Sequence, residues 1–238
     1  MKLVAVLLLS LTAIPAAAEP ACTAPPGYAG IGVPLPRVAS ALAAGREPVV
    51  VALGSSSTEG IGASGRERSY PARLAAEMRA RHGLALKVMN MGVGGEATSD
   101  MLRRFERDVM RYRPDLVIWQ VGSNTALRHV EPGPHHQALE TGIGRLRSAG
   151  IDVVLMSPQY APRVIEAPRH REIVTDLDRV AARSGIGLFH RFEIMRSWHD
   201  SGIGFDAMLS PDRLHMNDWS YGCVATLLAD AIAARLKP

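Results

Sequence analysis

Short, continuous apolar segments alternate along this chain with longer segments whose apolar residues recur at helical spacing. The first apolar run, at 48–53, is rich in β-branched residues and is broken by Gly54, as is typical of a strand buried on both faces of a sheet. The segment 70–82 has helical spacing and stops at Gly83, a residue type that often ends helices. This part of the chain therefore predicts a strand followed by a helix.

The same alternation continues to the end of the chain. Further strands are predicted at 86–90, 115–121, 151–156 and 186–189, further helices at 98–111, 136–149, 168–184 and 218–236, and longer loops at 158–168 and 201–211. Strands joined by helices of this length pair in parallel, because each helix returns the chain to the edge from which the previous strand started. We expect a single three-layer α/β/α domain around a central parallel sheet.

Residues 1–18 have the composition of a secretory signal peptide. Lys2 supplies a positive start, an apolar run follows at 3–14, and small residues come next. That run is shorter than the roughly 20 apolar residues that cross a bilayer. We expect a cleaved signal peptide, an N-terminal extension at 19–47 and the α/β domain at 48–238. The mature protein is then periplasmic or secreted, without stable membrane insertion.

The chain has two cysteines, Cys22 and Cys223. In an oxidising compartment they would pair and tie the N-terminus of the mature chain to the C-terminal helix. The alternative is two unrelated thiols, one in a flexible tail and one in the core. Both possibilities stay open at the level of sequence.

Composition and charge exclude several classes of protein. Of the 238 residues, 47% are hydrophobic, which is enough for a sizeable core and excludes a disordered chain. The formal net charge is +4, and the 27 Lys and Arg residues form no run of five or six. We therefore expect no nucleic-acid partner.

Residues suited to acyl transfer follow the predicted strands, where ligands bind in an open parallel sheet. The segments are Gly-Ser-Ser-Ser-Thr at 54–58, Asn-Met-Gly-Val-Gly-Gly-Glu at 90–96, Gly-Ser-Asn-Thr at 122–125 and Asp-Arg-Leu-His at 212–215. A serine becomes a nucleophile when a histidine takes its proton and a carboxylate orients that histidine. Backbone N–H groups and an amide can then bind the oxyanion. All these groups are present.

These segments resemble the Ser, Gly, Asn and His blocks of the SGNH, or GDSL-type, hydrolase family, in the same order and at comparable spacing. The resemblance spans most of the mature chain and implies the flavodoxin-like SGNH hydrolase fold for the α/β domain. By position, Ser56 corresponds to the nucleophile, His215 to the general base and Asp212 to the carboxylate that orients it. The oxyanion-hole donors correspond to the backbone N–H groups of Ser56 and Gly95 and the side chain of Asn124.

Two positions depart from the family pattern. Ser55 stands where the family usually has Asp, and Thr125 stands where an Asp usually follows the asparagine. Neither position is the nucleophile, the base or an oxyanion donor. The departures therefore concern the geometry of the loops and specificity more than the chemistry.

The resemblance implies an exported serine esterase that hydrolyses carboxylic esters through an acyl-enzyme, with no cofactor and no metal. The expected substrate is a small-molecule or carbohydrate ester with a short acyl chain, O-acetylated carbohydrate being one such class. The alternatives are a lysophospholipase or acyl-thioesterase of the same family, and a catalytically inactive exported binding module. The oligomeric state is not indicated. Residues that could line an apolar acyl slot are Val93, Met208, Leu209, Leu214 and Met216.

Two other sites are weaker hypotheses. The sequence Gly92-x-Gly94-x-x-Ala97 resembles a dinucleotide-binding turn, but Asp115, at about the expected distance, begins its predicted strand instead of ending it. His135 and His136 are adjacent, so regular structure cannot point both at one metal ion. We expect these two histidines to lie in a solvated loop.

Overall fold

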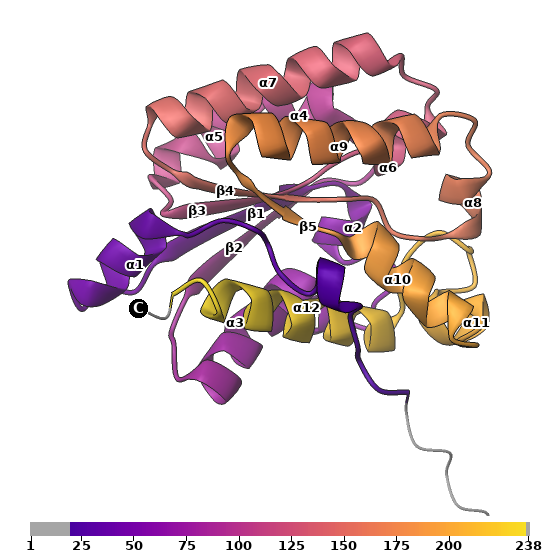
Figure 1. Ribbon diagram of the computed structural model, residues 1–238, viewed down its shortest axis with the longest axis horizontal. Helices are drawn as coiled ribbons and strands as arrows, with labels where there is room; N and C mark the ends of the chain where they lie inside the picture. The colour runs from indigo at the N-terminus through magenta and orange to yellow at the C-terminus, as the bar shows by residue number, and fades with distance from the viewer. Residues whose placement is uncertain (1–19, 237–238) are drawn as a thin grey trace, which may run out of the picture.

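A computed structural model describes residues 20–236 and places five strands in one sheet, in the order β2-β1-β3-β4-β5 (Figure 1). The strands are β1 (Val49–Gly54), β2 (Lys87–Gly92), β3 (Leu116–Gln120), β4 (Asp152–Met156) and β5 (Gly187–Phe189). Every neighbouring pair runs parallel. The predicted α/β/α domain with a central parallel sheet is confirmed.

Helices cover both faces of the sheet. They are η1 (Pro26–Tyr28), α1 (Pro36–Ala43), α2 (Ser56–Glu59), η2 (Arg66–Arg68), α3 (Tyr70–His82), α4 (Thr98–Arg103), α5 (Phe105–Asp108), η3 (Met110–Tyr112), α6 (Ser123–Leu127), α7 (Pro132–Ser148), α8 (Pro162–Ile165), α9 (His170–Ser184), α10 (Arg191–Asp200), α11 (Phe205–Met208) and α12 (Asp218–Ala233). Figure 1 shows α4, α5, α7 and α9 on one face and α1, α3 and α12 on the other.

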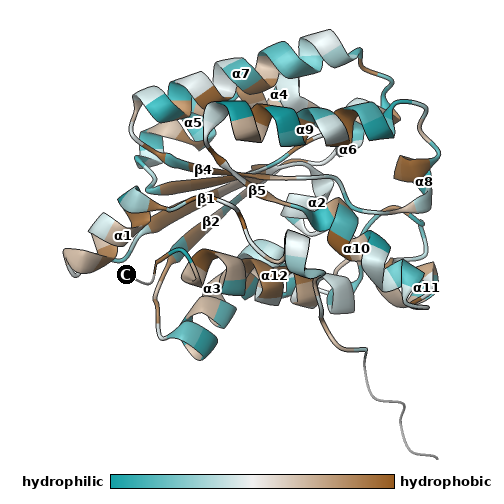
Figure 2. Cartoon of the chain, viewed as in Figure 1, coloured by the Kyte–Doolittle hydropathy of each residue, from teal (hydrophilic) through white to brown (hydrophobic). Residues whose placement is uncertain are grey.

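The sheet separates two apolar cores, because successive side chains of a strand point to opposite faces. Val51 and Leu53 of β1 belong to the core beneath α7 and α9, whereas Val50 and Ala52 belong to the core shared with α3 and α12. Figure 2 shows the strands as mainly hydrophobic, whereas α7 and α9 combine hydrophilic and hydrophobic residues. Burial on both faces explains why β1 is a continuous apolar run instead of an alternating one.

The N-terminal extension packs against the domain over much of its described length. Leu35 and Val38 are buried in the same core as α12. Cys22 and Cys223 form a disulfide, which resolves the pairing that the sequence left open. The predicted signal peptide, 1–18, lies outside the described residues, and the boundary at 47–48 stays a prediction. No helix within 20–236 is both long and apolar enough to span a membrane.

The predicted helix at 98–111 is interrupted. It divides into α4, α5 and η3, with a break at Arg104, whose φ of −105° and ψ of 10° leave the helical region. The buried guanidinium of Arg104 bonds to Glu96, to Asp108 and to the carbonyl oxygen of Gly54. Apolar spacing could not reveal this break, because the residue responsible is charged and two of its three partners, Gly54 and Glu96, lie outside the predicted helix.

Several helices were missed by the sequence pattern. The segments predicted as loops contain α8 and α11, and α10 was not predicted at all. The first three residues of α10 are Arg191, Phe192 and Glu193, and all three are buried. Two buried charged residues obscure the apolar stripe from which an amphipathic helix is normally recognised.

The prediction that His135 and His136 lie in a solvated loop is wrong. Both lie in α7, and the side chain of His135 is buried. Its Nδ1 lies 2.9 Å from the hydroxyl of Thr98 and 3.3 Å from that of Thr125. Burial lowers the pKa of His135 to about 4, although the nearby carboxylate of Asp176 opposes the shift. The histidine is therefore neutral at neutral pH and links α4, α6 and α7.

The buried histidine should make stability depend on pH. The folded-state pKa of about 4 lies below the ordinary 6.5, so the unfolded chain takes up the proton first as the pH falls. This contribution to stability is complete above about pH 6.5 and is lost towards pH 4. Between pH 7 and pH 5 we expect His135 alone to lower the free energy of unfolding by on the order of 2 kcal/mol.

Urea unfolding at both pH values measures this effect. His135→Gln should lose this share of the pH dependence, whereas His129→Asn, at an exposed histidine, should keep it. Equal pH dependence of the wild type and His135→Gln would contradict the assignment.

Candidate active site

The segments singled out in the sequence meet at the carboxyl edge of the sheet. β1 leads into α2, which begins with Ser56, and β3 leads into α6, which contains Asn124. The loop after β2 carries Gly95, and an ideal Cβ on the neighbouring Gly94 would lie 3.9 Å from the Cβ of Ser56. The segment Asp212 to His215 reaches the same place from outside the sheet.

Ser56, His215 and Asp212 form a continuous chain of hydrogen bonds. The hydroxyl of Ser56 lies 2.8 Å from Nε2 of His215, and Nδ1 of the same ring contacts a carboxylate oxygen of Asp212. The side chain of His215 is 12% exposed, so the ring is held in place but is not sealed from solvent. This is the arrangement in which imidazole can take a proton from a serine while a carboxylate orients the ring.

The carboxylate of Asp212 is held as an anion. Partial burial would raise its pKa, but hydrogen bonds from the backbone N–H and ring of His215, the backbone N–H of Leu214 and the hydroxyl of Ser210 outweigh burial. Together they hold the pKa of Asp212 well below its usual range. The carboxylate can therefore accept a hydrogen bond from a protonated Nδ1 of His215 at neutral pH.

A buried amide supports the loop that leads into Ser56. The Gln120 side-chain oxygen, at the end of β3, accepts hydrogen bonds from the backbone N–H and the hydroxyl of Ser55, each 3.0 Å long. Thr58 Oγ1 lies 3.4 Å from the same oxygen. The hydroxyl at position 55, where the family usually has an acid, thus donates its hydrogen bond to a neutral amide.

The end of β2 and the loop that follows it each need a glycine. A Cβ on Gly92 would lie 2.0 Å from the backbone nitrogen of Glu59, so α2 can pack against β2 only across a residue without a side chain. Gly95 has a φ of +78°, which glycine adopts without strain. Within 20–236, no hydrogen-bond acceptor occupies the backbone N–H of Gly95.

The side chain of Asn124 is oriented by the same loop. Its amide nitrogen donates a hydrogen bond of 3.0 Å to the carbonyl oxygen of Glu96, the residue after Gly95. An amide nitrogen carries two hydrogens, so one remains to act on a ligand. Arg104 in turn bonds Glu96 and the carbonyl oxygen of Gly54, which joins the loop to the end of β1.

The apolar lining differs from the expected slot. Met208, Leu209, Leu214 and Met216 are buried in the core, and Val93 alone of the five expected residues is exposed, at 41%. Ile61, which was not expected, is 44% exposed, and a Cβ on the next residue, Gly62, would lie 2.8 Å from the Cβ of His215. The backbone N–H of Ile61 bonds the carbonyl oxygen of Ser56, and the backbone N–H of Val93 bonds the carbonyl oxygen of Gly54, so both residues lie next to the turn that carries Ser56.

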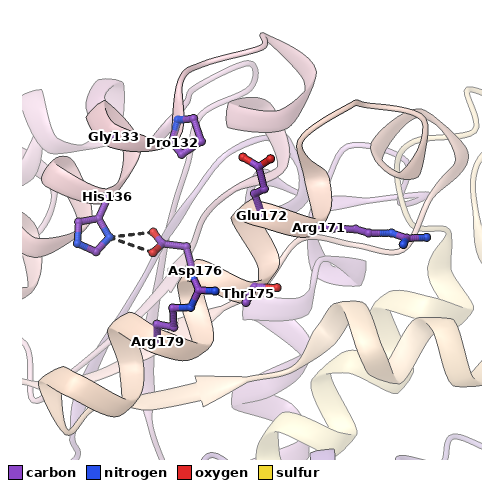
Figure 3. A pocket seen from close by; sticks show the side chains of 8 residues that line it. All are labelled: Pro132, Gly133, His136, Arg171, Glu172, Thr175, Asp176 and Arg179. Carbon is purple, nitrogen blue, oxygen red and sulfur yellow. Dashed lines mark hydrogen bonds and ion pairs between the residues drawn. The ribbon is translucent and has the colours of Figure 1, made fainter.

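The other functional candidates are separate from this site. A cavity of about 610 Å³ lies between α7 and α9, and Figure 3 shows its side chains, including His136 hydrogen-bonded to Asp176. None of the eight lining residues contacts Ser56 or His215 through a hydrogen bond, so the cavity is separate from this site.

Across the part of the chain that the structure describes, no cluster of three His, Cys, Asp or Glu side chains has the geometry to hold a metal ion. Asp115 bonds Arg46 where β3 begins, at the opposite edge of the sheet from Ser56.

The supporting residues Gln120 and Arg104 were missed from the sequence. One signal was present, because Gln120 is a polar residue at the end of an otherwise apolar strand. For Arg104 the sequence shows only the spacing to Asp108, an i,i+4 ion pair, since its partners at 54 and 96 come together only through the pairing of β1 with β2.

Comparison with known proteins supports the predicted relationship. Over 96 residues, 40% of this chain and 48% of the relative, the chain is 29% identical to an arylesterase from Vibrio mimicus. The chain spans about half the length of the curated relatives it matches.

Two solved structures have the same fold. One is the lipase/acylhydrolase from Enterococcus faecalis, with a TM-score of 0.69 and 27% identity, covering 80% of this chain and 98% of that one. The other is a two-domain esterase active on acetylated mannans, with a TM-score of 0.70 and 20% identity, covering 88% of this chain and 56% of that one. The predicted resemblance to SGNH, or GDSL-type, hydrolases is confirmed. A model of the non-GDSL lipase-like family matches residues 21–238, and the chain belongs to that family.

Proposed function

We propose that this protein is an exported serine esterase that hydrolyses carboxylic esters with short acyl chains. One observation carries the proposal: the hydroxyl of Ser56 and Nε2 of His215 lie 2.8 Å apart, with Asp212 on the far side of the ring. Membership of a lipase-like family and the esterase relatives support the same activity. The catalytic triad is Ser56, His215 and Asp212.

Hydrolysis proceeds in two acyl-transfer steps. The oxygen of Ser56 attacks the ester carbonyl carbon while His215 takes its proton. The imidazolium then gives that proton to the leaving alcohol, and the acyl group stays on Ser56. A water molecule, activated by the same histidine, attacks the acyl-enzyme, and the C–O bond to Ser56 breaks as the serine recovers its proton.

The tetrahedral intermediates carry a negative charge on the former carbonyl oxygen. The backbone N–H groups of Ser56 and Gly95 and the free N–H of Asn124 are the proposed donors to that oxygen. Ser56 begins α2, so its N–H is among those that helix geometry leaves without an intrahelical partner. Donors held in place before the reaction stabilise the developing charge without further reorganisation.

Export is part of the proposal. The leader at 1–18 has the composition of a signal peptide, and disulfides persist mainly in oxidising compartments. The Cys22–Cys223 bond agrees with folding outside the cytoplasm. The proposed mature protein begins after residue 18, with the extension at 19–47 attached to the domain at 48–238.

The proposed substrate class is a short-chain ester on a small molecule or carbohydrate. Within 20–236, Ile61 and Val93 are the exposed large apolar side chains, and their backbone N–H groups bond the carbonyl oxygens of Ser56 and Gly54. Each methylene buried against them contributes about 0.8 kcal/mol, and two side chains can cover only a short acyl group. The fold relative active on acetylated mannans makes O-acetylated oligosaccharides the first natural substrates to try.

Replacing the nucleophile should abolish turnover. Ser56→Ala should lower kcat for p-nitrophenyl acetate by on the order of 10³-fold or more, because no other group can carry the acyl chain. Ser148→Ala, at an exposed serine in α7, is the matched control and should keep wild-type rates. Comparable hydrolysis by the wild type and Ser56→Ala would favour the inactive binding module instead.

Removing the amide donor should slow the chemical step. Asn124→Ala should lower kcat by about 10²–10³-fold while KM for the same ester changes little, because the donor acts on the oxyanion more than on the bound ester. Asn124→Asp, which keeps the shape but has no N–H group, should lose as much. A rise in KM with unchanged kcat would remove Asn124 from the oxyanion hole.

The acyl-chain profile should peak at two to four carbons. Initial rates on p-nitrophenyl esters of increasing length, together with acetate release from acetylated xylo- and manno-oligosaccharides, measure it. The physical reason is the small apolar surface that Ile61 and Val93 provide. A maximum at eight carbons or beyond would point to the lysophospholipase or acyl-thioesterase alternative.

A further inference from the structure

An arginine without an acidic partner lies beneath the proposed active site. Arg191, the first residue of α10, is fully buried. None of the ion pairs formed among residues 20–236 includes Arg191. The titratable groups that act on its charge are the phenols of Tyr70 and Tyr221. Burial lowers the pKa of Arg191 to about 10 and raises the pKa of Tyr70 to about 12, so at neutral pH the guanidinium is charged and this phenol is not.

A charge buried without a counter-charge destabilises a fold unless hydrogen bonds compensate for lost hydration. Arg191 makes three such bonds, one from each nitrogen of the guanidinium. They reach the carbonyl oxygen of Ser157 at 3.0 Å, the hydroxyl of Ser57 at 3.2 Å and the side-chain oxygen of Gln159 at 3.1 Å. Because a guanidinium is planar and its donors point in fixed directions, these acceptors are held at fixed relative positions.

Two of these bonds lead to the reactive groups. Ser57 directly follows the nucleophile in α2. Gln159 donates a hydrogen bond of 3.2 Å from its amide nitrogen to the carbonyl oxygen of Leu214, which directly precedes His215. A buried path thus runs from Ser57 through Arg191 and Gln159 to Leu214. It connects the nucleophile helix to the histidine loop, independently of the direct contact between Ser56 and His215.

We propose that Arg191 is a positioning residue for ester hydrolysis: with Gln159 it clamps the nucleophile helix and the histidine loop at the separation that proton transfer needs. The proposal rests on the proposed function of the same site. It also gives the buried charge a role, because one guanidinium bonds all three acceptors at once. A lysine would supply a point charge in place of the planar fork.

Each arm of the clamp can be cut separately while Arg191 is left in place. Ser57→Ala removes the arm to the nucleophile helix. Gln159→Glu keeps the acceptor oxygens used by Arg191 and Ser123 but removes the donor to Leu214. Ser197→Ala, on the same helix as Arg191 and with a hydroxyl bonded only within that helix, is the control.

Each single variant should lower kcat for p-nitrophenyl acetate by on the order of tenfold, with KM within about twofold, because misplacement slows the chemistry more than binding. The double variant should lose about as much as either single one, since a clamp with one arm cut no longer holds the two loops together. Ser197→Ala should keep wild-type kinetics, and all variants should melt within a few degrees of the wild type.

The outcome separates this inference from the proposed function. Wild-type kcat in both single variants, or losses that multiply in the double variant, would overturn the clamp even if Ser56→Ala is inactive. If the wild type hydrolyses no ester, the proposed function fails, and the NMR signals of the His215 ring still test the clamp. Cutting either arm should shift or broaden those signals, and unchanged signals would refute it.

Discussion

The pairing of β1 with β2 on one side and β3 on the other decides where the reactive groups of this protein lie. In the parallel register Gly54 is opposite Gly92, so the loops after these two strands leave the sheet at the same height. Leu53 is opposite Trp119, one residue before Gln120, which supports the loop that leads into Ser56. The serine, the glycine loop and the asparagine therefore converge because of strand register, although they are up to 68 positions apart in the chain.

The histidine loop is the one part of the site that the sheet does not place. It lies between α11 and α12, and its conformation depends on the bridge between Leu209 and Met216 and on the cap that Asn217 provides for α12. Hydrogen bonds to Asp212 tighten the loop from within. Its position relative to α2 depends on contacts across the site, and one of these is the hydrogen bond from Gln159 to the carbonyl oxygen of Leu214.

Neutral groups support this site where acids are usual in the wider family. Ser55 is bound by Gln120, and Thr125 lies against the neutral ring of His135. The charged groups beneath the loops are the guanidinium groups of Arg104 and Arg191, of which Arg104 is paired with carboxylates. Loop geometry in this protein therefore depends on amides, hydroxyls and guanidinium groups, with Arg104 bonded to Glu96 and Asp108 and Arg191 bonded to neutral acceptors.

The sequence by itself determined the alternation of strands and helices, the parallel sheet and the identity of the polar residues at the strand ends, because burial on both faces imposes apolar runs of strand length. It did not reveal the break at Arg104, the helix that begins at Arg191 or the burial of His135, since each depends on partners that are distant in the chain. Tertiary structure alone decided which further polar groups, such as Gln120 and Arg104, support that edge of the sheet and which apolar side chains stay at the surface. The physical reason is that local periodicity indicates which positions are buried. Hydrogen-bond partners and close backbone contacts between distant segments form only when separate strands pair.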